Sequence, residues 1–303
     1  MVKEGLYFNE PFSEDYIRNF KIDKLLYQGR SKYQMIQCFT NKYFGKMLFL
    51  DKKIQSAQID EYIYHESLVH PVLLNHPSPR NVLILGGGEG ATVREVLRYP
   101  EVEKVTMVDI DKELIEICKQ YLPEWSKGAF DHPKTELFIG DARRFVENTA
   151  DKYDIIISDL TEPVNQGPSV MLFTQEFYQL ISSRLKDKGL FVMQAGSADM
   201  IHYDFFVSCY QTLKKEFPQV KPFWIFVLSF GLPWGFLSAA KDSSSFDIDK
   251  EKIKSRFDAL NRDGVRFYRP EMHSSYFILP VYLFNSLDKG KVITDKNPYI
   301  WTL

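Results

Sequence analysis

From residue 81 to residue 196 the sequence alternates short apolar runs with segments of helical periodicity. The apolar runs lie at 81–88, 104–111, 135–141, 153–160 and 189–196, and amphipathic segments lie between them at 91–100, 112–122, 142–149 and 174–185. Apolar strands separated by amphipathic helices are typical of a parallel sheet that is covered on both faces. The chain is therefore predicted to be an α/β protein with a mostly parallel sheet.

The first 60 residues follow a different pattern, in which aromatic and β-branched residues are broken by turn signals. Runs over residues 25–58 meet at Asn41–Lys42 and at Asp51–Lys52. This spacing predicts a small antiparallel β domain over residues 1–60 and a second, larger domain over residues 61–303. The segment DEYIYHESLVHPVLL then has apolar residues three to four apart, which predicts a helix that ends before HPSPR.

Beyond the alternating region the sequence predicts a helix at 203–217 and two strands at 221–230 and 234–241. Because the two strands lie close together in the chain, we expect an antiparallel hairpin at one edge of the sheet. The charged segment 247–262 places Ile253, Phe257 and Leu260 on one face, which predicts a surface helix.

Composition excludes several classes of partner. The chain has 38 Lys and Arg against 40 Asp and Glu, a formal net charge of -2, so no global positive field favours nucleic acid or an anionic membrane. The N-terminal residues lack the apolar core of a signal peptide, and apolar stretches such as 223–228 are too short to span a bilayer. Cys38, Cys118 and Cys209 are widely spaced, unlike a disulfide framework or a zinc site. We therefore expect a cytoplasmic protein.

The segment VLILGGGEGATVREV places Gly86, Gly87, Gly88 and Gly90 between a predicted strand and a predicted helix. Glycine at such a point lets the backbone turn tightly and lets a ligand approach the amide groups of a helix N-terminus. Its spacing differs from the dinucleotide fingerprint G-x-G-x-x-G, since Ala91 stands at the sixth position, a substitution that the fingerprint tolerates. Taken alone, the loop also fits a purely structural turn.

Two acidic residues at strand ends indicate what the loop binds. Asp109 ends the next predicted strand, about twenty residues after the loop, where a carboxylate can accept hydrogen bonds from both hydroxyls of an adenosine ribose. Asp141 ends the following strand and, beside Ala142, can accept the exocyclic amine of adenine. Asp141 can equally cap the helix that follows it. Together these positions predict an adenosine-containing ligand.

Further acidic residues indicate that this ligand is a cation. Glu89 lies inside the glycine loop, where its carboxylate would repel a pyrophosphate but would favour an ammonium or sulfonium group. Asp159 and Glu162 follow the fourth strand, at the carboxyl edge of the sheet where ligands bind in open α/β folds. The alternative is that Asp159 caps a turn and Glu162 is solvated.

Two other patterns have a structural interpretation. The histidines of HESLVH, His65 and His70, are five residues apart, whereas a zinc-binding HExxH helix needs a separation of four, so no metal site is expected. A group of aromatic residues near the predicted hairpin is typical of a hydrophobic core rather than of a pocket wall. The group consists of Trp224, Phe226, Phe230, Trp234 and Phe236.

The order of these segments resembles the polyamine aminopropyltransferases, the spermidine synthase family, from about Leu26 to Lys241. The matching stretches are YQGRSKYQ, FGKMLFLDKKIQSAQIDEYIYHE, HPSPRNVLILGGGEGATVREV, VDID, GDAR and DLTEP, which is a D-x-x-E-P version of the family's D-x-x-D-P motif. A methyltransferase would share only the glycine loop and the ribose acid. The resemblance implies a Rossmann-like, methyltransferase-type catalytic domain after the small β domain, and a homo-oligomer, either a dimer or a tetramer.

The resemblance also implies a reaction, in which decarboxylated S-adenosylmethionine is the co-substrate and its aminopropyl group passes to a polyamine acceptor. Methylthioadenosine is released, and no metal or redox cofactor takes part. Asp159 would take the proton of the attacking amine, and Tyr64 would help to orient that amine. The implied donor-binding residues are Gln34, Gln55, Gly86, Gly88, Glu89, Asp109, Asp141 and Ala142. The implied acceptor-binding residues are Glu162, His65, Phe230 and Trp234.

Several positions depart from the pattern of the putrescine-using spermidine synthases. Glu162 stands where aspartate is usual, His65 where glutamine is usual, and QAGSAD at 194–199 and SFGLPWGF at 229–236 replace other segments. The last of these, with the stretch that follows Asp159, is more similar to the agmatine-using enzymes and the thermospermine synthases. The acceptor is therefore expected from the putrescine, agmatine or spermidine class.

Two alternatives from other classes remain. An S-adenosylmethionine-dependent methyltransferase would share the fold, but the acidic residues Glu89 and Asp159 suit a donor carboxylate poorly. A non-catalytic binding module would keep the glycine loop and lose Asp159, Tyr64 or Gln34, all of which are present.

Overall fold

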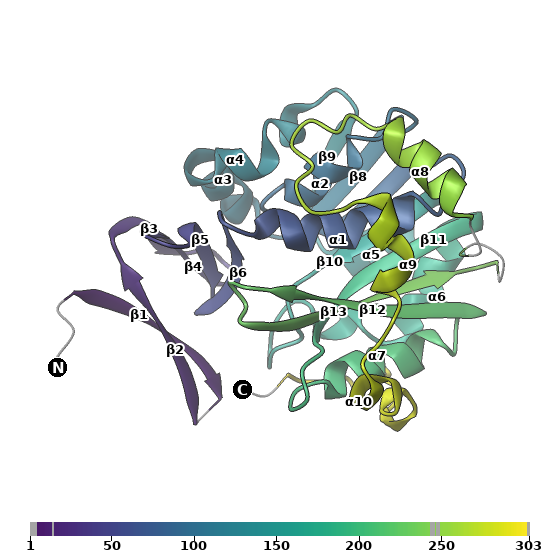
Figure 1. Ribbon diagram of the computed structural model, residues 1–303. Helices are drawn as coiled ribbons and strands as arrows, with labels where there is room; N and C mark the ends of the chain where they lie inside the picture. The colour runs from purple at the N-terminus through teal and green to yellow at the C-terminus, as the bar shows by residue number, and fades with distance from the viewer. Residues whose placement is uncertain (1–4, 14, 243–245, 247–248, 302–303) are drawn as a thin grey trace.

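The computed structural model describes residues 5–13, 15–242, 246 and 249–301. Its centre is a seven-stranded sheet with the strand order β12-β13-β11-β10-β7-β8-β9 (Figure 1). The strands are β7 (Asn81–Gly86), β8 (Lys104–Asp109), β9 (Thr135–Ile139), β10 (Tyr153–Asp159), β11 (Leu185–Ser197), β12 (Gln219–Val227) and β13 (Leu232–Ala240). Strands β7 to β11 pair in parallel, whereas β12 and β13 form the antiparallel hairpin at one edge. The predicted α/β class and the predicted edge hairpin are confirmed.

Each central strand is buried on both faces because its side chains alternate between two hydrophobic clusters. In β7, for example, Val82 and Ile84 belong to one cluster, and Leu83 and Leu85 belong to the other. Helices cover the two faces of this sheet (Figure 1). The described helices are α1 (Glu61–Leu73), α2 (Ala91–Val96), α3 (Lys112–Tyr121), α4 (Pro123–Ser126), α5 (Ala142–Asn148), α6 (Gln175–Arg184), α7 (Asp204–Leu213), α8 (Lys250–Asp258), α9 (His273–Tyr276) and α10 (Val281–Phe284). The surface helix predicted over 247–262 corresponds to α8, while residues 247 and 248 lie outside the described residues.

Two small antiparallel sheets precede the large sheet. The four-stranded sheet contains β3 (Lys24–Arg30), β4 (Met35–Asn41), β5 (Gly45–Leu50) and β6 (Lys53–Ala57), in sequence order. Asp51 and Lys52, with φ angles of 44° and 69°, form the tight turn between β5 and β6, as predicted. The hairpin of β1 (Leu6–Ser13) and β2 (Tyr16–Ile22) was not predicted, and it projects to one side in Figure 1.

Helix α1 is more deeply buried than its sequence pattern predicts. Three-to-four-residue spacing describes a helix with one apolar face, but every residue from Tyr64 to Leu73 is buried. The large sheet lies on one side of α1, while the C-terminal segment after α8 crosses its other side (Figure 1). The side chain of Glu66 accepts three backbone N–H groups of that segment, at residues 266, 267 and 268, over 2.7 to 2.8 Å.

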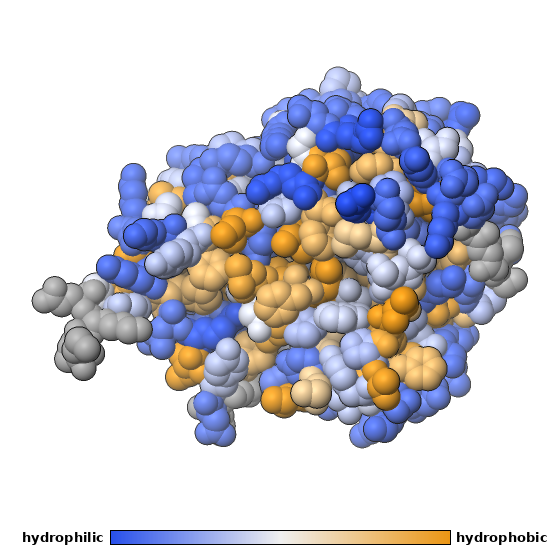
Figure 2. Space-filling view, viewed as in Figure 1, coloured by the Kyte–Doolittle hydropathy of each residue, from blue (hydrophilic) through white to orange (hydrophobic). Residues whose placement is uncertain are grey.

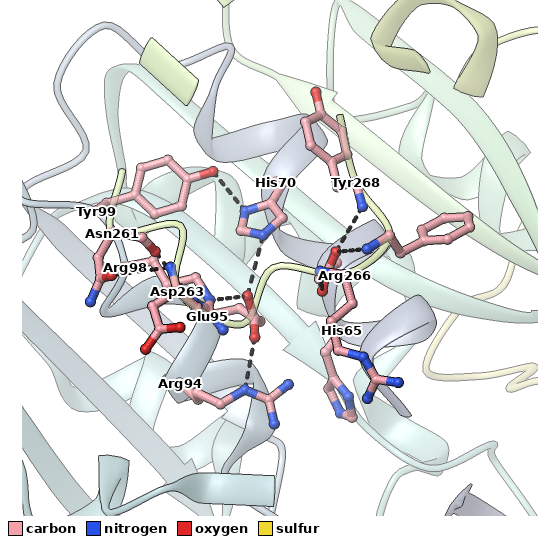
Figure 3. A network of polar contacts seen from close by, with 12 residues as sticks. His65, His70, Arg94, Glu95, Arg98, Tyr99, Asn261, Asp263, Arg266 and Tyr268 are labelled. Atoms are coloured by element: carbon pink, nitrogen blue, oxygen red, sulfur yellow. Dashed lines mark hydrogen bonds and ion pairs between the residues drawn. The ribbon is translucent and has the colours of Figure 1, made fainter. Parts of the chain in front are cut away.

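A buried ionic network joins α1 to α2 (Figure 3). The Glu95 carboxylate, fully buried, accepts hydrogen bonds from Arg94 Nε at 2.7 Å and Arg98 Nε at 2.5 Å, and lies 3.2 Å from His70 Nε2. Burial alone would raise the pKa of Glu95, but the hydrogen bond and charge of His70 and the charges of the two arginines hold it below its usual value. Glu95 therefore stays ionised and holds together the two helices that flank the carboxyl edge of the sheet.

Replacing Glu95 with glutamine should destabilise the protein strongly, because Arg94 and Arg98 would then lack their buried counter-charge. Breaking one side of a buried ion pair costs about 3–5 kcal/mol. The matched control is Glu103→Gln, since the pair of Glu103 with Arg80 is exposed, with 61% of each side chain accessible, and should contribute about 1 kcal/mol or less. Urea unfolding of both variants compares them, and equal losses would contradict the structural role of the network.

Candidate active site

A cleft with an empty volume of about 1030 Å³, including its open mouth, lies at the carboxyl edge of the large sheet. Loops after β7, β8, β9 and β10 form its floor, because parallel strands bring their carboxyl ends to one edge. The four-stranded N-terminal sheet and the β12–β13 hairpin supply other walls. Thirteen of the fourteen site residues expected from the sequence line this cleft, and they are Gln34, Gln55, Tyr64, Gly86, Gly88, Glu89, Asp109, Asp141, Ala142, Asp159, Glu162, Phe230 and Trp234.

The glycine loop is held directly against the end of β10. The backbone N–H of Gly87 donates to the carbonyl of Asp159 over 2.9 Å. Gly86 has a φ of +82°, and a Cβ atom there would lie 2.2 Å from the same carbonyl oxygen. Glycine is therefore required at this turn by its own conformation and by the close approach of a neighbouring strand. The turn fixes the loop and Asp159 relative to each other.

The Asp159 carboxylate lies between two hydroxyl donors. Its Oδ1 accepts a hydrogen bond from Tyr64 at 2.7 Å, and its Oδ2 accepts one from Thr92 at 2.5 Å. Tyr64 comes from α1 and Thr92 from α2, so both helices fix the orientation of the carboxylate. Burial, together with the charge of Asp159, raises the pKa of Tyr64 well above its usual value, so the phenol stays protonated and donates. Each oxygen of Asp159 keeps a further lone pair for a ligand.

The opposite end of the cleft carries the residues expected at the adenosine. Burial, with the negative charges of Asp111 and Asp159, raises the pKa of Asp109 to about 7. Gln34 donates from Nε2 to Asp111 at 2.9 Å, which joins the N-terminal sheet to the end of β8. Asp141 accepts the backbone N–H of Arg144 at 2.8 Å as the N-cap of α5, and it also lines the cleft. Its capping and ligand-facing roles are thus compatible.

Glu89 is held at both carboxylate oxygens. Its Oε2 accepts a hydrogen bond from Ser56 Oγ at 2.5 Å, and Ser56 in turn accepts one from the indole N–H of Trp125 at 2.9 Å. Its Oε1 lies 2.9 Å from Nε2 of His65. The carboxylate is therefore oriented from β6 on one side and from α1 on the other.

His65 is the one expected site residue that does not line the cleft. It is 1% exposed, and its Nδ1–H donates to the backbone carbonyl of Glu61 over 2.6 Å, while Nε2 faces Glu89. Both ring nitrogens thus face acceptors. Burial alone would lower the pKa of His65, but the hydrogen bonds and charges of Glu61 and Glu89 raise it to about 10. In this structure His65 forms an ion pair behind Glu89 and does not line the cleft.

The end of the cleft where the acceptor is expected combines an acid with aromatic walls. Burial raises the pKa of Glu162 to about 7, although the charge of Lys53 partly offsets this. Phe230 and Trp234 line the cleft with ring centroids 4.7 Å apart, and Phe230 lies 5.9 Å from Tyr64. The interpretation of these aromatics as core holds for Phe236, which is fully buried, and for Phe230, which is 6% exposed and also lines the cleft. It is wrong for Phe226, which is 48% exposed, and Trp234 faces the cleft.

Charge in the cleft is strongly one-sided. The acidic residues Glu89, Asp109, Asp141, Asp159 and Glu162 line it, and no lysine, arginine or histidine does so among the residues that the structure describes. A cation is the ligand that such a wall favours. The same part of the chain contains no cluster of three His, Cys, Asp or Glu side chains able to hold a metal ion.

Sequence reasoning missed three residues that orient the site. Ser56 and Thr92 hold Glu89 and Asp159, and Gln194 donates to the carbonyl of Leu160 over 2.6 Å while lining the cleft. Thr92 directly follows the glycine loop at the second position of a predicted helix, which is a signal that could have found it. Ser56 and Gln194 lie within strands, where the sequence carries no comparable signal.

The fold and the cleft define a class of Rossmann-like enzyme that binds a cationic ligand at the carboxyl edge of its sheet. Comparison with family models finds the spermine/spermidine synthase domain at residues 61–250 and the spermidine synthase tetramerisation domain at residues 7–66. The chain belongs to the spermine/spermidine synthase family. The expected resemblance is confirmed, and the tetramerisation domain supports assembly as a homo-oligomer.

Curated relatives and solved structures agree with this family. A polyamine aminopropyltransferase of Sulfolobus acidocaldarius is 43% identical over 91% of this chain and 92% of its own length. Polyamine aminopropyltransferase 2 of Hyperthermus butylicus is 42% identical over 92% of this chain and 91% of its own length. A spermidine synthase solved with the transition-state analogue AdoDATO matches with a TM-score of 0.86, at 32% identity over 95% of this chain and 96% of that one.

A second solved structure, the spermidine synthase of Thermotoga maritima, also matches with a TM-score of 0.86, at 31% identity and the same coverage. The expected reaction, aminopropyl transfer rather than methyl transfer, is confirmed. Within the residues that the structure describes, no helix is long and apolar enough to cross a membrane.

The ion pair behind Glu89 predicts a pH-dependent stability. Because the pKa of His65 is raised to about 10, its stabilising contribution is fully present below about pH 6.5, the ordinary histidine value, and is lost as pH rises through 10. His65→Gln should therefore unfold at a lower temperature than the wild type at pH 6.5, by about 5 °C or more, with the difference shrinking toward pH 10.

Thermal unfolding scans between pH 6 and 10 measure this difference. His132→Gln is the control, because His132 is exposed. A difference between wild type and His65→Gln that stays constant over this range would show that His65 is not held as an imidazolium.

Proposed function

We propose that this cleft aligns decarboxylated S-adenosylmethionine with a polyamine so that Asp159 takes the proton of the attacking nitrogen. The acceptor nitrogen forms a bond to the aminopropyl carbon next to the sulfonium, and the bond from that carbon to sulfur breaks. Methylthioadenosine leaves, and the proton passes from Asp159 to water. The observation that carries the assignment is the position of Asp159, fixed by Tyr64 and Thr92 in a cleft without basic side chains among the described residues.

The donor would lie along the glycine loop. Asp109 would accept the ribose hydroxyls, and Asp141 with Ala142 would contact the adenine. Glu89, whose two oxygens are already oriented by Ser56 and His65, would bind the cationic aminopropyl end. Burial raises the pKa of Asp109 to about 7, and hydrogen bonds donated by the two ribose hydroxyls would stabilise its carboxylate form and lower that pKa again.

The acceptor would lie between Asp159 and Glu162. An alkylamine has a pKa near 10, so keeping its nitrogen unprotonated at pH 7 costs about 4 kcal/mol. A carboxylate that orients the amine and accepts its proton during transfer reduces this cost. The sulfonium already activates the carbon, so the remaining acceleration comes from holding the two reactants in line. Gln34 and Gln55 would complete the donor pocket, while Phe230 and Trp234 would cover the acceptor chain.

Asp159→Asn should reduce turnover by about 10²–10⁴-fold, because the amide keeps the size of the side chain but cannot accept the proton. The dissociation constant of the donor should change by less than about threefold. Asp151→Asn, an exposed aspartate just before β10, is the matched control. Steady-state release of methylthioadenosine, together with calorimetric donor binding, separates the two effects, and undiminished turnover would contradict the assigned base.

Asp109→Ala should weaken donor binding rather than the chemical step. Two hydrogen bonds donated by the ribose hydroxyls to a charged carboxylate contribute about 1.5–3 kcal/mol each, so the KM for the aminopropyl donor should rise by about 100-fold or more. The turnover at saturating donor should fall far less than in Asp159→Asn. A variant with an unchanged donor KM would place the ribose elsewhere.

The function is tested by offering purified protein and decarboxylated S-adenosylmethionine a panel of putrescine, cadaverine, agmatine, norspermidine and spermidine. Methylthioadenosine release and product masses identify the acceptor. The names of the relatives do not distinguish among acceptors, and the replaced segments around Glu162 and Phe230 support agmatine or a triamine. Release with none of the amines would overturn the proposed function.

Assembly and compartment are parts of the same proposal. Figure 2 shows hydrophobic residues gathered over the region of β12, β13 and the C-terminal helices, where Phe226, Leu228 and Ile278 are 48%, 52% and 69% exposed. Such a patch supports assembly into a dimer or tetramer.

Cys38, Cys118 and Cys209 are free and buried, which supports a reducing compartment such as the cytoplasm.

A further inference from the structure

A second cavity opens from the acceptor end of the cleft. Ile54, Glu162, Phe230 and Trp234 line both cavities, so a molecule bound at Glu162 can extend from one into the other. We name this second cavity the outer chamber, and its empty volume, including its mouth, is about 1030 Å³. Its remaining walls come from the β1–β2 hairpin, the segment that leads into α7, the residues near position 300, and Lys53, Val164 and Leu232.

The C-terminal wall of the outer chamber is fixed to the loop that carries Glu162. The backbone N–H of Trp301 donates to the carbonyl of Pro163 over 2.8 Å, and Trp301 forms a parallel β-bridge with Val164. Trp301 and Tyr299 both line the chamber. Two aromatic rings therefore stand next to the acceptor site although they lie about 140 residues after it in the chain.

The wall formed by the β1–β2 hairpin and the start of β6 carries two basic groups that are held by contacts within the chain. Arg18 donates to the Glu10 carboxylate over 2.6 Å, and the ammonium of Lys53 donates to the carbonyl of Pro11. Both cations also lie over the ring of Phe12, at 5.7 and 5.4 Å from its centroid. Glu10 therefore balances the charge of Arg18, whereas the charge of Lys53 acts on Glu10 and Glu162.

The opposite wall carries an acid without a counter-charge. Asp204 is the first residue of α7 and lines the chamber, and it forms no ion pair with any part of the chain that the structure describes. The nearby His202 is instead paired with Asp199 at 3.0 Å. A carboxylate beside aromatic faces is a site for an organic cation, since ring faces and the acid both attract positive charge.

We propose that the outer chamber binds the far cationic end of a long acceptor and thereby selects acceptors by length. The ligand class is an alkylamine that extends past the nitrogen bound at Glu162 and ends in a cation. It is a triamine, whose third nitrogen is an ammonium, or a guanidino amine, whose guanidinium begins at that nitrogen and continues past it. Its methylene chain lies along Trp234 and Phe230, and its terminal cation lies between Asp204 and the rings of Tyr299 and Trp301. A four-carbon diamine ends at Glu162 and gains nothing from the chamber. This inference rests on the proposed function.

The test compares kcat/KM for putrescine, agmatine and spermidine in the wild type and in Asp204→Asn. The wild type should prefer agmatine or spermidine to putrescine by at least about tenfold, and which of the two is preferred identifies a guanidinium or an ammonium as the bound group. Asp204→Asn should lower kcat/KM for the long acceptor by about tenfold and leave putrescine within about twofold. Asp187→Asn, an exposed acid at the start of β11, should change neither.

A second pair of variants tests the aromatic wall. Trp301→Ala should lose the preference for the long acceptor, whereas Trp301→Phe, which keeps a ring, should retain most of it. Both variants preserve the backbone N–H that donates to Pro163. A thermal unfolding scan checks that Trp301→Ala remains folded. If it does not, the comparison of Asp204→Asn with the wild type alone tests whether the outer chamber binds the far end of the acceptor.

The results separate the two proposals. Equal losses for short and long acceptors in Asp204→Asn, or no loss for either, would overturn the outer chamber as a binding site while aminopropyl transfer to putrescine still supports the proposed function. A wild-type preference for putrescine would also overturn it. Absence of methylthioadenosine release with every amine would overturn both.

Discussion

The burial of several carboxylates in one cleft is the constraint on which the rest of the structure depends. Burial, with neighbouring negative charge, raises the pKa of Asp109 to about 7, and burial, partly offset by the charge of Lys53, raises that of Glu162 to about 7. Asp159 and Glu89 are instead stabilised by donors on both oxygens, which come from α1, α2 and the N-terminal sheet. The fold must therefore bring three separate elements against one sheet edge, and the buried network around Glu95 holds two of them there.

The architecture of the large sheet could be predicted because the sequence patterns that determine it each lie within one short segment. Apolar strands that alternate with helices of 3.6-residue period determine a parallel, doubly covered sheet, and the order of the segments leaves few other arrangements. The β1–β2 hairpin lacked such a signal, since Phe8 and Phe20 are buried by contact with Phe49 of another sheet rather than by a pattern within the hairpin. The complete burial of α1 likewise depends on the C-terminal segment 266–268, which is far away in sequence.

The residues of the candidate site also fall into positions that the sequence could predict and positions that it could not. Positions at the carboxyl ends of strands, such as Asp109 and Asp159, could be predicted because topology alone brings these ends together. The direction in which a side chain points could not be predicted, because packing against distant residues determines it. His65 belongs to a helix that faces the cleft at Tyr64, yet its ring turns to Glu61 and Glu89. Ser56 contacts Glu89 only because β6 lies beside the glycine loop, and no periodicity in the sequence indicates that arrangement.

The two ends of the cleft are built from different kinds of segment, so we expect them to tolerate substitutions differently. The donor end is built on strand ends and on backbone contacts such as the bond from Gly87 to Asp159, so a substitution there disturbs the sheet edge itself. The acceptor end is assembled from the hairpin loop, the loop at Glu162 and the segment at Trp301, which meet through a few contacts. Side chains on these segments can change without moving Asp159. Such a division of the cleft lets the residues around Glu162 vary while the contact between Asp159 and the glycine loop is kept.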